Sequence, residues 1–246
     1  MPLCGERSLV MEIIKVNSYE ELSAKAASII CAQVVLKPDS VLGLATGSSP
    51  VGTYKKMIEK CEKGEVDFSR VRTVNLDEYV GLEGTHPQSY RYFMNTNLFD
   101  HINIDKNNTR VPCGVAADIA KECAEYDAYI ESLGGIDLQV LGIGIDGHIG
   151  FNEPDYCFTK PTHEVSLDPS TIDANARFFE SRDDVPRKAI TMGMGAIMGA
   201  KKIVFVANGK AKKDIVEKAF SGQIVPEIPA SILQLHPNCT VIYTED

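Results

Sequence analysis

Short apolar segments and longer segments with helix capping signals follow one another along the chain. The apolar segments, such as "VLGL" and "LQVLGIGI", show no alternation of polar and apolar residues, which is typical of strands buried on both faces. The predicted strands are residues 11–16, 40–47, 71–80, 136–145, 201–209 and 240–246. The predicted helices between them are residues 18–38, 50–64, 86–99, 117–135 and 210–222. This alternation predicts an α/β fold in which helices cover both faces of a mostly parallel, open sheet.

The boundaries of the first two helices follow from particular residues. Ser18 and Glu21 form a capping box, and Pro38 stops the helix that they begin. The next helix begins near Pro50 and ends near Gly64.

The chain is expected to form a single domain, because no repeat, low-complexity segment or change in composition divides it. Residues 151–185 are less regular, and residues 188–200 are predicted to form either a helix or a glycine-rich turn. The stretch "MEIIKV", which begins at Met11, already has the pattern of a first strand. We therefore expect residues 11–246 to form one α/β domain and residues 1–10 to be an N-terminal appendage.

Composition and charge exclude several classes of partner. The chain has 246 residues, 25 of them basic and 34 acidic, and a formal net charge of -9, which argues against binding to nucleic acid. No apolar segment is long enough to cross a bilayer, and the first residues contain no secretory signal, so no membrane partner is expected. The seven cysteines are widely spaced and form no CxxC pair, which is typical of reduced thiols in a cytoplasmic protein.

Residues suited to binding a phosphate follow the second predicted strand, in "ATGSSP". They are Thr46, Gly47, Ser48 and Ser49. Hydroxyls, a glycine and the free amides of a helix start can bind an anion, although the same composition is typical of an ordinary capped turn. Lys212, after "NG", and Arg177, in "NARFF", would add cations, although either residue alone is more often a solvated surface group.

Asp77 lies just beyond the apolar part of the predicted strand 71–80, in "NLDEYV". A carboxylate in this place can act as a general base if partial burial raises its pKa. The alternative is a loop aspartate that caps a turn. Glu78 is a second candidate, but the alternation of side chains along a strand would point it to the opposite face.

The stretch "IDGHIGFNEP" places Asp146, His148 and Glu153 within eight positions. Gly147 and Gly150 disfavour a helix, so the spacing does not match a helical metal motif. A metal site is an alternative, as are three hydrogen-bonding loop residues. The favoured interpretation needs no metal: the two carboxylates orient the imidazole and raise its pKa, so that it can transfer protons.

These segments are expected to meet at one edge of the sheet, because ligands of open α/β sheets bind outside the carboxyl ends of the strands. A phosphate cradle, a single base and a proton-transferring histidine together suit a sugar phosphate. The histidine would open a pyranose ring between O5 and C1, and the base would remove the proton at C2 of the open-chain form. This aldose–ketose chemistry requires no cofactor.

The sequence resembles the glucosamine-6-phosphate deaminases (glucosamine-6-phosphate isomerases) over almost the whole chain from Met11. The matching stretches are "GLATGSSP", "NLDEYVGL", "HPQSYRYFM", "GIGIDGHIGFNEP", "NARFF" and "LQLHP". "DGHIGFNEP" is the most diagnostic, because the related 6-phosphogluconolactonases share "DGH" but do not continue with "FNEP".

The resemblance implies a Rossmann-like fold and the conversion of α-D-glucosamine 6-phosphate and water to β-D-fructose 6-phosphate and ammonia, in the catabolism of amino sugars such as N-acetylglucosamine. It implies that Asp77 moves a proton from C2 to C1 and that His148 opens the ring. Asp146 and Glu153 would orient His148 and balance its charge. The phosphate would be bound by Thr46, Gly47, Ser48, Ser49, Arg177 and Lys212.

The chain departs from the allosteric members of this family, in which N-acetylglucosamine 6-phosphate binds at subunit contacts. In those members, a serine and basic residues after "FNEP" and a C-terminal tail form the site. Here Tyr156 replaces a serine, His163 and Val165 occupy the places of the basic pair, and the sequence ends at Asp246. We therefore expect no such activation. Lys160 is the one residue here that would favour an allosteric site. A homo-oligomer is compatible with the sequence, but the resemblance gives no support for a hexamer.

Two other functions compete with the deaminase. A lactonase acting on a phosphorylated sugar acid would need no base at C2, so activity that depends on Asp77 would count against it. A regulatory module that binds sugar phosphates without catalysis would usually carry a DNA-binding segment. The acidic net charge and the complete set of candidate catalytic residues disfavour that module.

Overall fold

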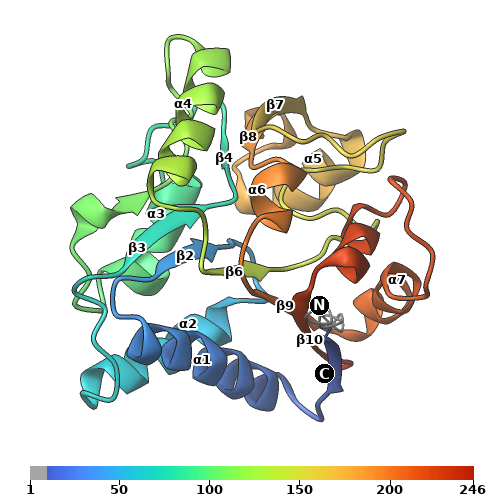
Figure 1. Cartoon of the computed structure of the whole chain (residues 1–246). Helices are drawn as coiled ribbons and strands as arrows, with labels where there is room; N and C mark the ends of the chain where they lie inside the picture. The colour runs from blue at the N-terminus through green and yellow to red at the C-terminus, as the bar shows by residue number, and fades with distance from the viewer. Residues whose placement is uncertain (1–9) are drawn as a thin grey trace, which may run out of the picture.

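Seven parallel strands form the central sheet of this computed structural model, which describes residues 10–246 (Figure 1). In spatial order they are β1 (Val10–Lys15), β10 (Asn238–Thr244), β9 (Ile203–Asn208), β6 (Leu138–Leu141), β2 (Val41–Leu44), β3 (Arg72–Asn75) and β5 (Thr109–Arg110). From β2 the chain builds toward the β5 edge, whereas from β6 it builds toward the opposite edge. The strand order therefore reverses between β2 and β6, which is where ligands bind in open α/β sheets.

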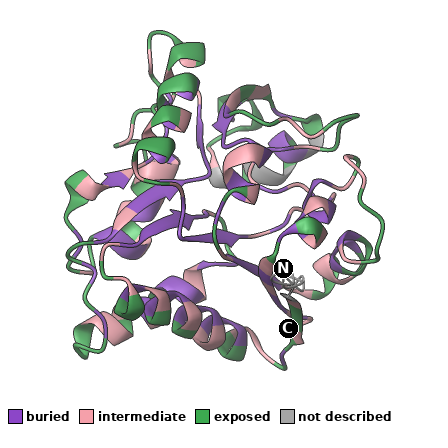
Figure 2. Cartoon of the chain, viewed as in Figure 1, coloured by how far each residue is buried: buried purple, intermediate pink, exposed green. Residues whose placement is uncertain are grey.

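Helices cover both faces of this sheet, as Figures 1 and 2 show. On one face lie α1 (Tyr19–Leu36), α2 (Val51–Glu62) and α3 (Tyr90–Met94), which continues as a π-helix (Asn95–Phe99). On the other face lie α4 (Ile119–Ser132), α6 (Met194–Met198) and α7 (Lys213–Ala219). Each face has its own core of buried apolar side chains, with the strands between them. The predicted α/β class, with a parallel sheet covered on both sides in one domain, is confirmed.

The ends of the first helix agree with its predicted signals. The Ser18 hydroxyl accepts a hydrogen bond from the Glu21 amide at 3.1 Å, while the Glu21 carboxylate accepts one from the Asn17 amide at 3.0 Å. The helix ends at Leu36, two residues before Pro38. The first strand begins at Val10, and the rest of the predicted appendage, residues 1–9, lies outside the described residues.

A second, smaller sheet was not predicted. Its antiparallel strands lie in the order β4 (Asp77–Tyr79), β8 (Lys188–Thr191) and β7 (His163–Ser166). The prediction of a single strand over residues 71–80 is therefore wrong. These residues form β3 and β4, and the chain passes from one sheet to the other at Leu76. The Leu76 amide donates to Leu44 of the large sheet, and its carbonyl accepts a hydrogen bond from Met192, next to β8.

Other segments also differ from expectation. The strand expected over residues 136–145 ends at Leu141, and Ile145 is 69% exposed. Residues 188–200 contain both a strand, β8, and a helix, α6, instead of a helix or turn alone. The irregular stretch 151–185 contains β7 and the helix α5 (Pro169–Asn175). These strands are short and pair with segments distant in sequence, so the local pattern does not reveal them.

Two buried tyrosines hold the carboxyl ends of β2 and β3. The Tyr54 hydroxyl accepts a hydrogen bond from the Ala45 amide at 3.2 Å and donates to the Ala45 carbonyl at 2.6 Å. The Tyr126 hydroxyl does the same at Asn75, with distances of 2.9 Å and 2.7 Å. Both side chains are fully buried. Each hydroxyl thus satisfies backbone groups at the point where the chain leaves the sheet.

Replacing Tyr126 with phenylalanine should destabilise the fold. Without the hydroxyl, the buried amide and carbonyl of Asn75 lose their partner, which costs about 1–3 kcal/mol for an unsatisfied buried group. Urea unfolding of Tyr126→Phe should show that loss. Tyr92→Phe, at a tyrosine that is 39% exposed, is the matched control and should leave stability nearly unchanged. Equal stability of the two variants would contradict the proposed role of the hydroxyl.

Candidate active site

A cavity of about 290 Å³ lies at the carboxyl ends of β2, β3 and β6 and brings most of the predicted site together. Nine of the ten predicted residues line it: Thr46, Gly47, Ser48, Ser49, Asp77, Asp146, His148, Arg177 and Lys212. The tenth, Glu153, lies beside His148 and lines a neighbouring cavity. Segments separated by up to 166 residues, from Thr46 to Lys212 (212 − 46), therefore converge on one site.

The predicted phosphate turn connects β2 to the start of α2. Gly47 has a φ of 91°, which favours glycine, and Thr46 to Ser49 all line the cavity. A residue that the sequence analysis missed supports the turn from α1: the Tyr19 hydroxyl donates to the carbonyl of Ser48 at 2.9 Å and accepts from the amide of Gly52 at 2.7 Å. Tyr19 thus connects the turn to the first helical residues of α2 through one hydroxyl.

The two predicted cations reach the same cavity from different elements. Lys212 precedes α7, and its ammonium donates to the hydroxyl of Ser49 at 3.1 Å; that hydroxyl in turn donates to Asn208 at 2.8 Å. Burial lowers the pKa of Lys212. Arg177 lies in a 3₁₀ turn (Ala176–Phe178) and is exposed on the cavity wall. Two cations and a turn of amides and hydroxyls are suited to binding an anion.

Asp77 is the first residue of β4 and is only 5% exposed. Its Oδ1 is buried and has no hydrogen-bond partner among the described residues. Burial, together with repulsion from Glu78, raises the pKa of Asp77 to about 8, although attraction by His148 opposes the shift. A carboxylate with such a pKa, on the wall of a ligand cavity, has the properties of a general base.

Glu78 serves a different purpose from its neighbour. Its carboxylate accepts hydrogen bonds from the amides of Tyr79, Tyr90 and Arg91, at 2.9, 2.9 and 3.0 Å. Two of these amides belong to the first turn of α3, so Glu78 anchors that helix. The residue does not line the cavity, in agreement with the expected alternation along the strand.

His148 lies in a tight turn after β6, close to two carboxylates. Its Nδ1 is 2.7 Å from Asp146 Oδ1 and 3.8 Å from Glu153 Oε2. The same Asp146 oxygen accepts a hydrogen bond from the His148 amide at 3.2 Å. Burial alone would lower the pKa of His148, but Asp146 and Glu153 outweigh it and raise the pKa. The imidazole therefore faces the cavity with a raised pKa, a property suited to proton transfer.

The two carboxylates beside His148 respond in opposite directions. Burial acts to raise the pKa of Asp146, but contact with His148 lowers it to about 2. For Glu153 the effect of burial prevails, and its pKa is raised despite His148 and a hydrogen bond from Thr171. Asp146 is thus the permanent counter-charge of His148, and Glu153 is a second, more readily protonated one.

Asp146, His148 and Glu153 are also the described residues best placed to hold a metal ion. One ligand atom from each lies within 4.8 Å of the others. An ion bound there would compete with the proton on His148 that these carboxylates stabilise. The arrangement therefore suits proton transfer at least as well as it suits a metal.

Two further residues complete the cavity and were not predicted. Thr171, on α5, lines the cavity and donates a hydrogen bond to Glu153 Oε1 at 2.8 Å. Tyr90, at the start of α3, packs flat against Phe151, with ring centroids 5.9 Å apart. Neither lies in a local pattern that indicates function, and the stretch "HPQSYRYFM", which contains Tyr90, indicates only the family resemblance.

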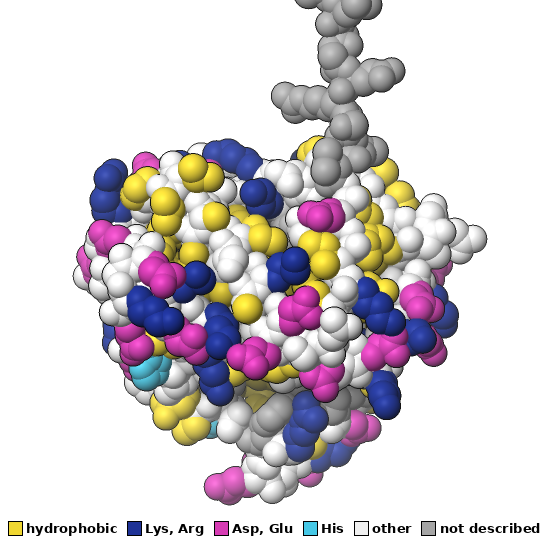
Figure 3. Space-filling view, turned by 90° about the horizontal axis from the view of Figure 1, so that it is seen from below, with side chains coloured by type: hydrophobic (Ala, Val, Ile, Leu, Met, Phe, Trp, Pro, Cys, Tyr) yellow, Lys and Arg dark blue, Asp and Glu magenta, His cyan; other side chains and the backbone are white. Residues whose placement is uncertain are grey.

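The outer surface carries charges of both signs. On the face seen from below Figure 1, lysines and arginines are interspersed with aspartates and glutamates (Figure 3). Among the described residues, no helix is both long and apolar enough to cross a bilayer. The anion site in the cavity is thus a local cationic feature on a chain whose net charge is -9.

Comparisons of the sequence with known proteins agree on one family. The sequence model of a family described as glucosamine-6-phosphate isomerases/6-phosphogluconolactonase matches residues 17–242. A glucosamine-6-phosphate deaminase from Lachnoclostridium phytofermentans is 65% identical over 94% of this chain and 98% of its own, and one from Clostridium perfringens is 57% identical over 96% and 98%.

Solved structures give the same result. One described as a monomeric glucosamine-6-phosphate deaminase of the NagB superfamily matches with a TM-score of 0.93 and 44% identity, over 95% of this chain and 97% of its own. A 6-phosphogluconolactonase from Thermotoga maritima matches with a TM-score of 0.71 and 18% identity, over 96% and 99%. At that identity the second match concerns the fold alone.

Replacing Asp77 with asparagine should stabilise the fold increasingly as pH rises. The pKa of Asp77 is about 8 in the folded protein and 3.8 ordinarily, so the folded state holds a proton that the unfolded state has lost. Wild-type stability should therefore fall between pH 4 and pH 8, by up to about 1.4 kcal/mol per pH unit. Asparagine has no such proton to lose.

Urea unfolding at a series of pH values measures the difference. The advantage of Asp77→Asn over the wild type should grow from pH 5 to pH 8 and then level off. Asp214→Asn, at an exposed position of α7, is the control. A difference independent of pH would show that Asp77 ionises normally in the folded protein.

Proposed function

Because this chain belongs to the glucosamine-6-phosphate isomerase/6-phosphogluconolactonase family, we propose that it converts α-D-glucosamine 6-phosphate and water to β-D-fructose 6-phosphate and ammonia, in amino-sugar catabolism. The observation that carries this proposal is the buried, proton-accepting Asp77 in the same cavity as an anion site and His148. A lactonase reaction removes no proton from C2 and would therefore not need Asp77 as a base. The relatives named glucosamine-6-phosphate deaminase are 55–65% identical in sequence to this chain.

The phosphate binds first at the turn after β2. Amides and hydroxyls of Thr46–Ser49 contact its oxygens, and Lys212 and Arg177 neutralise its charge. This contact places the sugar between the phosphate turn and the His148 loop. Since the turn is already held by Tyr19, little ordering is needed on binding.

His148 opens the ring. The imidazole takes the proton from the C1 hydroxyl and gives one to O5 as the C1–O5 bond breaks, so that no net proton is consumed. Asp146 and Glu153 stabilise the charged imidazole during this exchange. The raised pKa of His148 keeps a proton available for O5 near neutral pH.

Asp77 then moves a proton from C2 to C1. In its ionised form it removes the proton from C2 of the open-chain aldose, and it returns that proton to C1. The nitrogen is left on C2 as an imine, and water adds there to release ammonia and form the ketose. The steps are proton transfers by groups in the cavity and the addition of water to the imine, and this chemistry requires neither a cofactor nor a metal.

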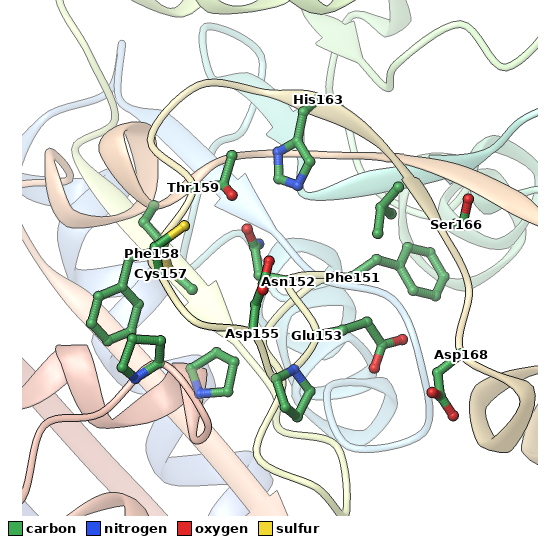
Figure 4. A pocket seen from close by; sticks show the side chains of 15 residues that line it. Phe151, Asn152, Glu153, Asp155, Cys157, Phe158, Thr159, His163, Ser166 and Asp168 are labelled. Atoms are coloured by element: carbon green, nitrogen blue, oxygen red, sulfur yellow. The ribbon is translucent and has the colours of Figure 1, made fainter.

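We further propose that N-acetylglucosamine 6-phosphate does not activate this protein. A second cavity, of about 280 Å³, lies on the other side of Glu153, where the resemblance places the allosteric residues (Figure 4). It is lined by the carboxylates of Glu153, Asp155 and Asp168, and none of its described lining residues is lysine or arginine. His163 is the one basic side chain among the described residues that line it. An acidic lining disfavours a phosphate.

Lys160, the residue that argued for such a site, lies elsewhere. It lines a third cavity between α4 and α6, and its carbonyl accepts a hydrogen bond from the Gly195 amide at 2.9 Å. Tyr156, which occupies the place of a serine, is 95% exposed. Lys160 therefore does not take the place of the basic pair in the second cavity, beside Glu153.

One chain is proposed to be sufficient for activity, because all ten predicted site residues come from the same chain. The relative with 44% identity is described as monomeric, although the sequence is compatible with a homo-oligomer. A cytoplasmic location is proposed from the free thiols of the six described cysteines.

The first test is the stoichiometry of the products. With glucosamine 6-phosphate and excess EDTA, the protein should release ammonia and fructose 6-phosphate in equal amounts at an undiminished rate. Replacing Asp77 with asparagine should lower kcat about 10²–10⁴-fold, as expected for loss of a general base, while KM changes little. Normal turnover by Asp77→Asn would refute the assignment of the base, and Asp214→Asn again serves as the control.

The second test concerns regulation. Initial rates over a range of glucosamine 6-phosphate concentrations should follow a hyperbola, and N-acetylglucosamine 6-phosphate should leave kcat and KM unchanged. A sigmoid curve that the acetylated sugar converts to a hyperbola would show that an effector site exists despite the acidic lining.

A further inference from the structure

Thr171 holds the outer carboxylate of the ring-opening group. It is 7% exposed, and its hydroxyl donates a hydrogen bond to Glu153 Oε1 at 2.8 Å. The other oxygen, Oε2, lies 3.8 Å from His148 Nδ1. We propose that Thr171 is a positioning residue for ring opening, because its hydroxyl fixes the Glu153 carboxylate with Oε2 toward His148. This proposal rests on the proposed role of His148.

Glu153 needs such support because its contact with His148 is not itself a hydrogen bond. Oε2 is buried and has no hydrogen-bond partner among the described residues, and 3.8 Å is too long for one. A glutamate side chain has several rotamers of similar energy, and an ion pair at this distance selects weakly among them. The hydrogen bond from Thr171 to the opposite oxygen therefore determines where Oε2 lies.

The hydrogen bond also affects the charge of Glu153. Burial and the nearby Asp146 carboxylate raise the pKa of Glu153, while His148 and the Thr171 hydroxyl lower it. Without the hydroxyl, Glu153 would be protonated at higher pH, and His148 would lose one of the negative charges that raise its own pKa.

Other titratable groups surround this pair. Asp146 and Asp77 face His148 from the substrate side, whereas Asp155, His163 and Asp168 line the cavity on the other side of Glu153. Asp146, which lies 2.7 Å from His148, would still raise the pKa of His148 when Thr171 is changed, so the proposal predicts partial loss of function.

The place of Thr171 in the chain adds to its significance. It belongs to α5, which leads directly into the 3₁₀ turn that carries Arg177. The segment that supplies a cation for the phosphate therefore also supplies the hydroxyl that orients Glu153. Sequence spacing could not reveal this contact, because Thr171 and Glu153 are 18 residues apart and lie in different elements.

The test compares Thr171→Val, which removes the hydroxyl, with Thr171→Ser, which keeps it. Thr53→Val is the matched control, since Thr53 is fully buried and its hydroxyl has no hydrogen-bond partner among the described residues. We expect Thr171→Val to lower kcat about tenfold, the effect of one weakened charge contact, and Thr171→Ser and Thr53→Val to remain near the wild type. The acid limb of the pH profile of kcat should move to higher pH in Thr171→Val only.

Binding of an open-chain inhibitor separates positioning from general damage. The alditol analogue of the substrate, 2-amino-2-deoxyglucitol 6-phosphate, cannot form a ring, so its inhibition constant should be unchanged in Thr171→Val. A rise in that constant matching the fall in kcat would overturn the proposal, and so would failure of Thr171→Ser to retain activity.

A measurement without turnover keeps this proposal separate from the proposed function. NMR titration of the His148 imidazole should give a lower pKa in Thr171→Val than in the wild type, Thr171→Ser or Thr53→Val. An unchanged value would refute the positioning role even if the deaminase reaction is confirmed. Absence of ammonia release by the wild type would instead refute the function, whatever the titration shows.

Discussion

The burial of the Asp77 carboxyl group is the constraint around which the site is arranged. Its Oδ1 has no hydrogen-bond partner among the described residues to compensate for the loss of water, so the charged form is unfavourable. The chain places it there by passing between two sheets at Leu76, where backbone hydrogen bonds to both sheets fix the crossing. The neighbouring carboxylate of Glu78 is stabilised by three amides and does not line the cavity, so Asp77 is the carboxyl group that β4 contributes to it.

Two aspartates in this cavity have opposite properties because their surroundings differ. Asp77 has a raised pKa, mainly because of burial, and so can gain and lose a proton near neutral pH. Asp146 has a lowered pKa because His148 lies 2.7 Å away, and so it remains a carboxylate. Division of acid–base work between identical side chains requires such a difference in environment. Here the difference comes from the backbone, which directs one aspartate toward apolar and acidic neighbours and the other toward an imidazole.

The sequence predicted the site better than it predicted the elements that carry it. The phosphate turn, the strand end with Asp77 and the stretch from Asp146 to Glu153 are local motifs, and parallel strands bring their carboxyl ends together. The break at Leu76 and the small antiparallel sheet could not be predicted, since they depend on pairing with β8, more than 100 residues away. The contacts of Tyr126 and Thr171 are also between distant segments, and their residue types are ordinary in helices.

The distance between the phosphate site and the base is set by backbone contacts. Leu44 and Asn75 are paired in register at the ends of β2 and β3, so the phosphate turn and the Asp77 strand leave the sheet at the same level. Tyr54 and Tyr126 bind the backbone at Ala45, which follows Leu44, and at Asn75 itself. In the proposed reaction, a sugar anchored by its phosphate would therefore present C2 to a carboxyl group that the backbone of β4 positions. Since the benefit of proximity is lost with displacements of about 1 Å, holding both ends through the main chain is the more accurate arrangement.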